Sequence, residues 1–161
     1  MKAISIKPEW AYLIVGGFKS IEVRTWQTKA PINLLVCTSK SSSFPLYPKG
    51  YAVGVIHIEA ITPMHEGLLE DACMDEMPDK PSYAWHISSF LPCKPFPVKG
   101  KLHIYDVPVE LEELETIPNE ATDEEMAETI HSWLAPLVKE MPNNLEEALA
   151  DEDFYPILWP F

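Results

Sequence analysis

A net charge of −13 on 161 residues argues against a long polyanion as the partner, because nucleic acid is bound through lysines and arginines that displace its counterions. The apolar fraction of 47% is ordinary for one soluble globular domain, and no apolar run reaches the roughly 18 residues of a membrane-spanning helix or forms a secretory leader. Three separated cysteines without a C-x-x-C pair, and five histidines without metal spacing, favour a cytoplasmic protein with reduced thiols, no metal site and no cofactor.

The first elements follow from the spacing of apolar residues. Residues 3–6 predict a short strand, and Pro8 suits the first turn of a helix whose apolar side chains continue over 10–14. The pair Gly16-Gly17 ends this helix. Over residues 20–26 apolar and polar side chains then alternate with period two, which is typical of a half-buried strand.

This strand carries the most informative motif of the chain, because residues 17–24 have the pattern G-x-K-x-x-E-x-R. If the apolar residues of the strand point inward, Glu22 and Arg24 must share the other face. Lys19 lies at the entrance of the strand, so an ammonium, a carboxylate and a guanidinium gather on one short element. Arg24 is the only arginine in the chain, which indicates that planar bidentate geometry is needed there.

Runs rich in β-branched residues predict further strands at 32–37, 51–62, 82–87 and 98–105, with a short helix around 67–74. Prolines punctuate residues 91–97 and separate the last two of these strands. About six strands and one early helix indicate a mixed α/β (α+β) fold, namely a small β-barrel of five to six strands with flanking helices.

The C-terminal part differs in charge and pattern from the rest. Residues 1–105 hold 11 Lys+Arg and 9 Asp+Glu, whereas residues 106–161 hold one Lys and 16 Asp+Glu. Apolar residues at helical spacing predict a helix within 121–140 and a second short one at 144–150. The apolar, aromatic residues 154–161 would not be left exposed. We expect an acidic helical extension over 108–161 that packs on the barrel or on a partner protein.

Several segments occur in a meaningful order along the body of the chain. They are I-S-I-K-P-E-W-A at 4–11, L-I at 13–14, the G-x-K-x-x-E-x-R run, L-L-V-C-T-S-K at 34–40, Y-A-W at 83–85 and P-V-K-G at 97–100. In this ordered set the chain resembles the ASCH family (activating signal cointegrator homology), a branch of the PUA-like barrels. The resemblance spans about residues 1–107, which we interpret as one ASCH domain, and does not cover 108–161.

The resemblance implies a cleft in which Lys19, Glu22 and Arg24 face RNA or a nucleotide-like ligand. The negative charge of the extension favours a small or single-stranded ligand, because repulsion weakens the binding of a long polyanion most. An internal ion pair between Glu22 and Arg24 that braces the barrel is the structural alternative, and both roles can coexist. Lys19 can likewise be a ligand contact, a proton-transfer amine or an ordinary solvated lysine.

Four more residues are candidates for ligand binding. Ser39 and Lys40 end a strand in a polar loop, where a hydroxyl could meet a phosphate, although a flexible surface turn is the simpler explanation of these residues. Trp10 and Trp85 could stack on a base, as could Trp26, although tryptophans at such positions are commonly walls of the core.

Two other functions remain open. Some small bacterial members of the family resemble amidohydrolases that remove acetyl from acetylated cytidine, using the motif lysine, a threonine where Glu22 stands here, and a later glutamate. On that interpretation Lys19 and Glu22 are catalytic, but the missing hydroxyl favours binding over catalysis. The third possibility is a protein-interaction module that binds its partner through the acidic, aromatic tail.

Overall fold

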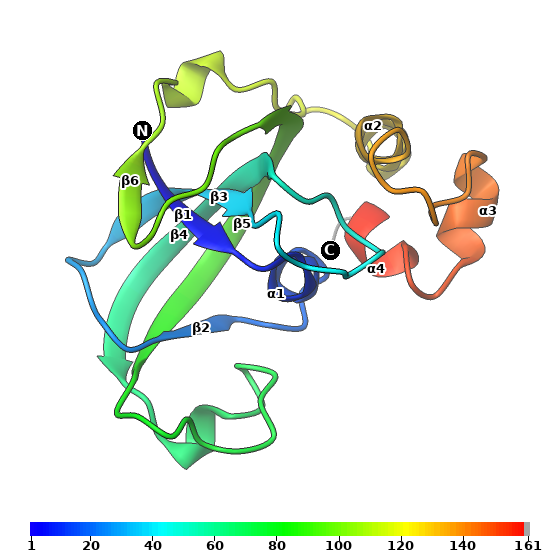
Figure 1. Ribbon diagram of the computed structural model, residues 1–161. Helices are drawn as coiled ribbons and strands as arrows, with labels where there is room; N and C mark the ends of the chain where they lie inside the picture. The colour runs from blue at the N-terminus through cyan, green and yellow to red at the C-terminus, as the bar shows by residue number, and fades with distance from the viewer. Residues whose placement is uncertain (160–161) are drawn as a thin grey trace.

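The computed structural model describes residues 1–159, and these contain one six-stranded sheet in the order β2-β5-β4-β3-β1-β6 (Figure 1). β1 and β3 are parallel, and all other neighbours are antiparallel. β2 and β6 form the two edges, so the sheet is not closed by hydrogen bonds, and the predicted mixed α/β class with a barrel-like sheet is confirmed. The strands are β1 (Lys2–Ile6), β2 (Ile21–Arg24), β3 (Ile32–Thr38), β4 (Tyr51–Pro63), β5 (Tyr83–Pro97) and β6 (Ile104–Asp106).

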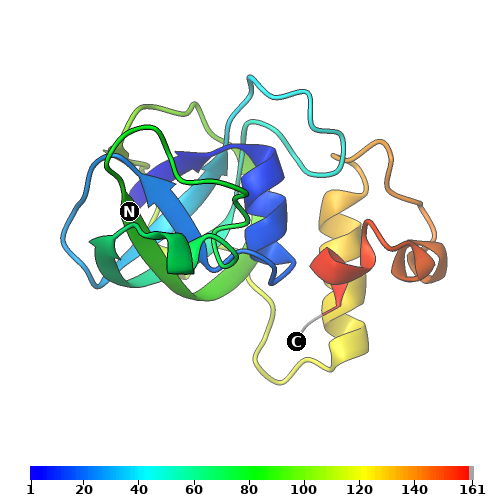
Figure 2. The same ribbon diagram turned by 90° about the horizontal axis from the view of Figure 1, so that it is seen from below.

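The helices lie to one side of this sheet. Figure 2 shows α1 between the sheet and the C-terminal helices. Within residues 1–159 no helix is long and apolar enough to cross a membrane. The helices are α1 (Pro8–Val15), α2 (Asp123–Leu134), α3 (Leu145–Ala150) and α4 (Tyr155–Leu158), with 3-10 turns η1 (Glu66–Leu68) and η2 (Leu111–Glu113).

The C-terminal helices share the main core with the sheet and α1. Phe154, Ile157 and Leu158 are buried in the same cluster as Ile4 of β1 and Ile14 of α1. This packing removes from water the apolar surface that the sequence predicted would not stay exposed. Pro160 and Phe161, the end of that apolar run, lie outside the described residues. The division of the chain after residue 107 stays a prediction.

The strand predicted at 82–87 is longer than expected, because β5 continues through the proline-punctuated residues 91–97. β2 pairs with β5 only over Tyr83–His86, whereas β4 pairs with it as far as Pro97. On its other side, the second half of β5 pairs in the described residues only through an isolated bridge between Cys93 and Thr116, and is otherwise an edge. A proline that cannot donate a hydrogen bond is tolerated at such an edge.

Three other predicted elements are shorter than expected. Of the predicted strand 98–105 only Ile104 and Tyr105 pair with β1, as part of β6, and residues 98–103 form a loop. The predicted helix 67–74 is reduced to the turn η1. α2 ends at Leu134, because Pro136 has no N–H with which to extend the helix.

Candidate functional site

β2 places the motif residues at the edge of the sheet next to β5. Its four residues pair antiparallel with β5, with Glu22 opposite Trp85 and Arg24 opposite Tyr83. Lys19 precedes the strand, directly after the turn that ends α1. The three charged residues thus come from one short segment, as the sequence predicted, but their environment differs from an open cleft.

Lys19 is enclosed on all sides, with only 4% of its surface exposed. Its Nζ donates a hydrogen bond to the backbone oxygen of Ala72 at 2.8 Å and lies 4.9 Å from the ring centroid of Trp10. Glu22 Oε1 is 3.7 Å from the same nitrogen. The ammonium is therefore held by a carbonyl, an aromatic face and a carboxylate.

Glu22 links Lys19 to Arg24. The Glu22 side chain is 8% exposed, and its Oε2 accepts a hydrogen bond from Arg24 Nη2 at 2.9 Å. The same guanidinium nitrogen also donates to the backbone oxygen of Ser5 at 2.8 Å. The Arg24 side chain is 22% exposed, so it is the member of the group that reaches solvent. Glu22 thus pairs with both Lys19 and Arg24, and we call these three residues the motif cluster.

Burial dominates the electrostatics of Lys19. Removal of its ammonium from water lowers the pKa of Lys19, while the nearby Glu22 carboxylate acts in the opposite direction. A buried charge of this kind persists only when it is paired and hydrogen-bonded, which is the condition met here. The motif cluster accordingly fits the alternative of an internal ion pair that braces the fold at this edge.

An open cavity of about 410 Å³ is connected to the motif cluster through Ser5, which lines the cavity and whose backbone oxygen accepts the hydrogen bond from Arg24. We call it the basic pocket, and its walls include Ser5, Ser39, Lys40, Lys99, Lys101 and Leu102. Three lysines and several hydroxyl groups make it suitable for an anion. Two of the candidate residues from the sequence, Ser39 and Lys40, lie together in this pocket.

The loop 98–103 supplies the part of the basic pocket that sequence reasoning missed. A Cβ on Gly100 would lie 2.8 Å from the Ser5 hydroxyl oxygen, so a glycine is needed for the loop to approach β1 this closely. That hydroxyl is also hydrogen-bonded to the Tyr105 hydroxyl at 2.8 Å. The signal for it in the sequence is K-G-K at 99–101, which lies within the predicted strand 98–105.

Of the predicted stacking residues, Trp85 is buried, and Trp10 and Trp26 are partly buried. Trp85 is completely buried, and its indole N–H donates to the backbone oxygen of Trp26 at 3.2 Å. Trp26 packs edge-on against both Trp85 and His103, with ring centroids 4.9 and 4.8 Å apart. Trp10 is partly buried, with Lys19 over its ring. Trp85 therefore has no free face for a base, and Trp10 serves as a wall of the motif cluster.

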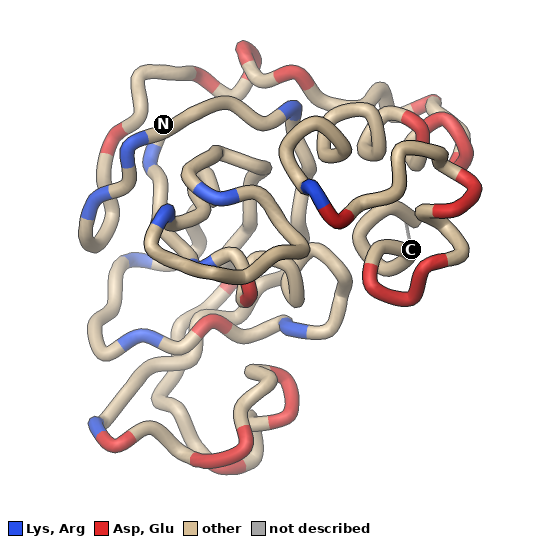
Figure 3. Tube along the Cα trace, turned by 45° about the vertical axis from the view of Figure 1, so that its right-hand side comes forward, with Lys and Arg blue, Asp and Glu red and all other residues tan. Residues whose placement is uncertain are grey.

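The acidic extension forms no salt bridge with the motif cluster in the described residues. In the part of the chain that the structure describes, the salt bridges of Lys19 and Arg24 are with Glu22 and not with any carboxylate after residue 107. Figure 3 shows the acidic positions gathered along the C-terminal helices and the loop after β4, whereas most basic positions lie around the sheet. The two signs of charge thus occupy different regions of the molecule.

Comparison with known proteins identifies related sequences and folds. The model of the ASCH domain family matches residues 4–132. Similar solved structures include an ASCH protein from Zymomonas mobilis and two single-residue variants of it, each 18% identical, with TM-scores of 0.52 to 0.53. The alignments cover 70% of this chain and 89 to 91% of those chains. At this identity the likeness concerns the fold alone. No curated protein matches the sequence.

Proposed function

This chain belongs to the ASCH domain family, and from that premise we propose that it binds single-stranded RNA or a nucleotide-like ligand in the basic pocket. The observation that carries the proposal is the gathering of Lys40, Lys99 and Lys101 around one cavity in a strongly acidic protein. Ser39 and Ser5 add polar groups that can bond to phosphate or ribose. Leu102, which is 86% exposed at the rim, offers an apolar contact to a base.

The motif cluster has a positioning role in this proposal. Glu22 holds Arg24, and Arg24 holds the backbone of Ser5, which is a wall of the basic pocket. Lys19 stabilises the carboxylate of Glu22 from the other side. Arg24, which is partly exposed, can also contact the ligand directly. Lys19 and Glu22 act through it.

The charge of the whole molecule favours a short ligand. The three lysines of the basic pocket attract an anionic ligand, whereas the Asp and Glu side chains of residues 106–161 repel it. Surface charges act over about 8 to 10 Å at physiological salt, so a mononucleotide avoids most of this repulsion and a duplex does not. We therefore expect a preference for mononucleotides and short single strands over double-stranded RNA.

Fluorescence anisotropy with a short labelled oligouridine tests the proposal. The variant Lys99→Ala/Lys101→Ala should bind about tenfold more weakly at low salt, and the slope of log affinity against log salt should fall by about 0.7 for each phosphate that no longer meets a lysine. The control Lys80→Ala/Lys94→Ala removes the same charge from exposed positions elsewhere. Equal weakening by both variants, or no binding by the wild type, would contradict a specific basic pocket.

An amidohydrolase acting on a modified nucleoside such as acetylated cytidine is the second candidate. It is favoured by Lys19, because burial lowers the pKa of this amine, as is needed for proton transfer. Against it, Nζ is already occupied by the carbonyl of Ala72 and by Glu22. Release of cytidine from its acetylated form, abolished by Lys19→Ala in a folded variant, would establish this activity.

A further inference from the structure

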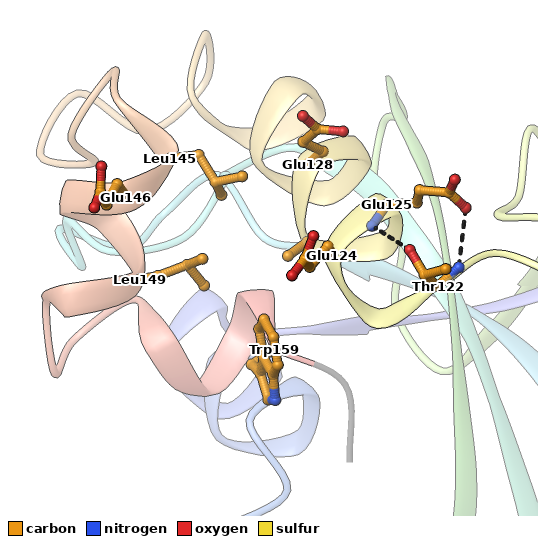
Figure 4. A pocket seen from close by; sticks show the side chains of 9 residues that line it. Thr122, Glu124, Glu125, Glu128, Leu145, Glu146, Leu149 and Trp159 are labelled. Carbon is orange, nitrogen blue, oxygen red and sulfur yellow. Dashed lines mark hydrogen bonds between the residues drawn. The ribbon is translucent and has the colours of Figure 1, made fainter.

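A second cavity lies far from the motif, between α2 and α3. It has a volume of about 570 Å³, within the usual range of ligand pockets. We call it the acidic groove, and its relevant residues are Glu124, Glu128, Leu145, Glu146, Leu149 and Trp159. Figure 4 shows Glu124 and Glu128 on α2 across from Leu145 and Leu149 on α3, with Trp159 below them.

The negative charge of the acidic groove is not compensated within the protein. In residues 1–159, Glu124, Glu128 and Glu146 have no salt bridge to a lysine or arginine. Glu125 differs, because its carboxylate accepts the backbone N–H of Thr122 in the capping box of α2. Lys139 is the one Lys or Arg of residues 106–161, and within the described residues it forms no salt bridge with these glutamates. The three carboxylates are therefore free to pair with cationic groups of a partner.

The interior of the groove is apolar. Leu145 and Leu149 lie one turn apart on α3, both only partly buried, and point at the same space as Trp159. The Trp159 ring is stacked on Tyr155, with centroids 6.3 Å apart. An apolar side chain can pack on the two leucines, and a lysine or arginine can lie over the tryptophan ring while meeting the glutamates.

Charge and shape together define the occupant. The glutamates repel RNA and anionic lipid. In the described part of the chain no group of three or more His, Cys, Asp or Glu converges as a metal site would require. We propose that the acidic groove docks a basic segment of a partner protein, in which lysines or arginines flank at least one apolar side chain. This goes beyond the ligand of the basic pocket and does not depend on it.

The position of the groove sets it apart from what the family model covers. That model ends at residue 132, whereas Leu145, Glu146, Leu149 and Trp159 all follow it. α2 is about 18 Å long at 1.5 Å per residue, which gives an extended or helical segment room to lie along it. The positively charged basic pocket thus lies beside the sheet, and the negatively charged acidic groove lies between the C-terminal helices.

Binding of a short fluorescein-labelled peptide of lysine and leucine, with its leucines at helical spacing, tests the proposal in the full chain. The variant Glu124→Gln/Glu128→Gln/Glu146→Gln should bind about tenfold more weakly, since three exposed ion pairs of roughly equal strength no longer form. The control Glu70→Gln/Asp75→Asn/Glu76→Gln makes the same charge change at exposed positions near η1 and should bind like the wild type. All six substitutions keep side-chain size, and circular dichroism checks the fold.

A second comparison tests the apolar interior. Replacing the leucines of the peptide by serine should weaken binding by a similar factor, and Leu149→Ser in the protein should remove that difference. Equal loss in both triple variants would show that binding follows net charge alone, which overturns the proposal. Equal binding of the serine peptide, or full displacement by spermine, would show a site for small polycations and would also overturn it. Peptide binding that persists in Lys99→Ala/Lys101→Ala separates this proposal from the function of the basic pocket.

Discussion

Neutralising Glu22 tests whether the motif cluster is a structural brace. In Glu22→Gln, Lys19 keeps its hydrogen bond to Ala72 and its contact with the Trp10 ring, but it loses the salt bridge with the Glu22 carboxylate. Its ammonium remains inside the protein. Breaking a buried pair by removing one partner typically costs about 3–5 kcal/mol, and the other interactions of Lys19 place our expectation near the lower end, about 3 kcal/mol. For a chain of this length that corresponds to a fall in Tm of roughly 6–12 °C.

Urea and thermal unfolding measure this loss, and the chain contains a matched control. Lys2 and Asp106 form a salt bridge with the same N···O distance, 2.9 Å, as Arg24 and Glu22, but their side chains are 56% and 78% exposed. Asp106→Asn should change stability little, because water screens an exposed pair. The comparison isolates burial as the cause.

The double variant Lys19→Met/Glu22→Gln completes the test. Removing both charges leaves no unpaired buried ion near Ala72, so much of the stability lost in Glu22→Gln should return. The deficit of Glu22→Gln should also shrink as pH rises toward 10.5, because the folded protein then holds a neutral Lys19 while the unfolded chain still binds the proton. A Glu22→Gln protein as stable as Asp106→Asn at neutral pH would refute the brace.

Three further predictions concern the core. Burial raises the pKa of Cys93 to about 12, so between pH 9 and 12 the thiol stays protonated in the folded protein and ionises in the unfolded chain. The free energy of unfolding of the wild type should therefore fall as pH rises through this range. In urea titrations, Cys93→Ala should lose about 1 kcal/mol less stability than the wild type between neutral pH and pH 10. Gly54→Ala should cost about 2 kcal/mol or more in chemical denaturation, because its Cβ would lie 2.5 Å from the Leu91 oxygen and the Phe90 ring. Phe154→Ala should cost about 3–5 kcal/mol, whereas Tyr155→Ala, at an exposed position, should cost less than about 1 kcal/mol; equal losses would mean that α4 does not contribute to the core in solution.

The spacing of apolar residues predicted well those helices and strands that are specified by their own residues. The helix after Pro8 and the strand at the motif lie where the spacing placed them. The continuation of β5 through its prolines was not predictable in this way, because it depends on β2 covering only the first residues of its partner. The late start of β6 likewise depends on its short pairing with β1.

The candidate site shows the same division. The sequence predicted that Glu22 and Arg24 share a face, since alternate residues of a strand must do so, and that Lys19 lies at the entrance of the same strand. The burial of Lys19 and Glu22 depends on the fold, because the turn at Ala72 and the ring of Trp10 close over Lys19, with which Glu22 is paired. Both faces of an edge strand can be covered by segments distant in the sequence, and a periodic pattern carries no information about that.

The family, the motif and the contrast between a near-neutral body and an acidic extension can all be read from the order of the amino acids. Where the free charges meet depends on how the chain folds. Ser39 and Lys40 line the same cavity as Lys99 and Lys101 because Gly100 lets its loop approach β1. The glutamates of α2 lie across from the leucines of α3 because both helices pack against α4. Such encounters depend on the path of the whole chain through space, whereas a motif depends only on neighbours in the sequence.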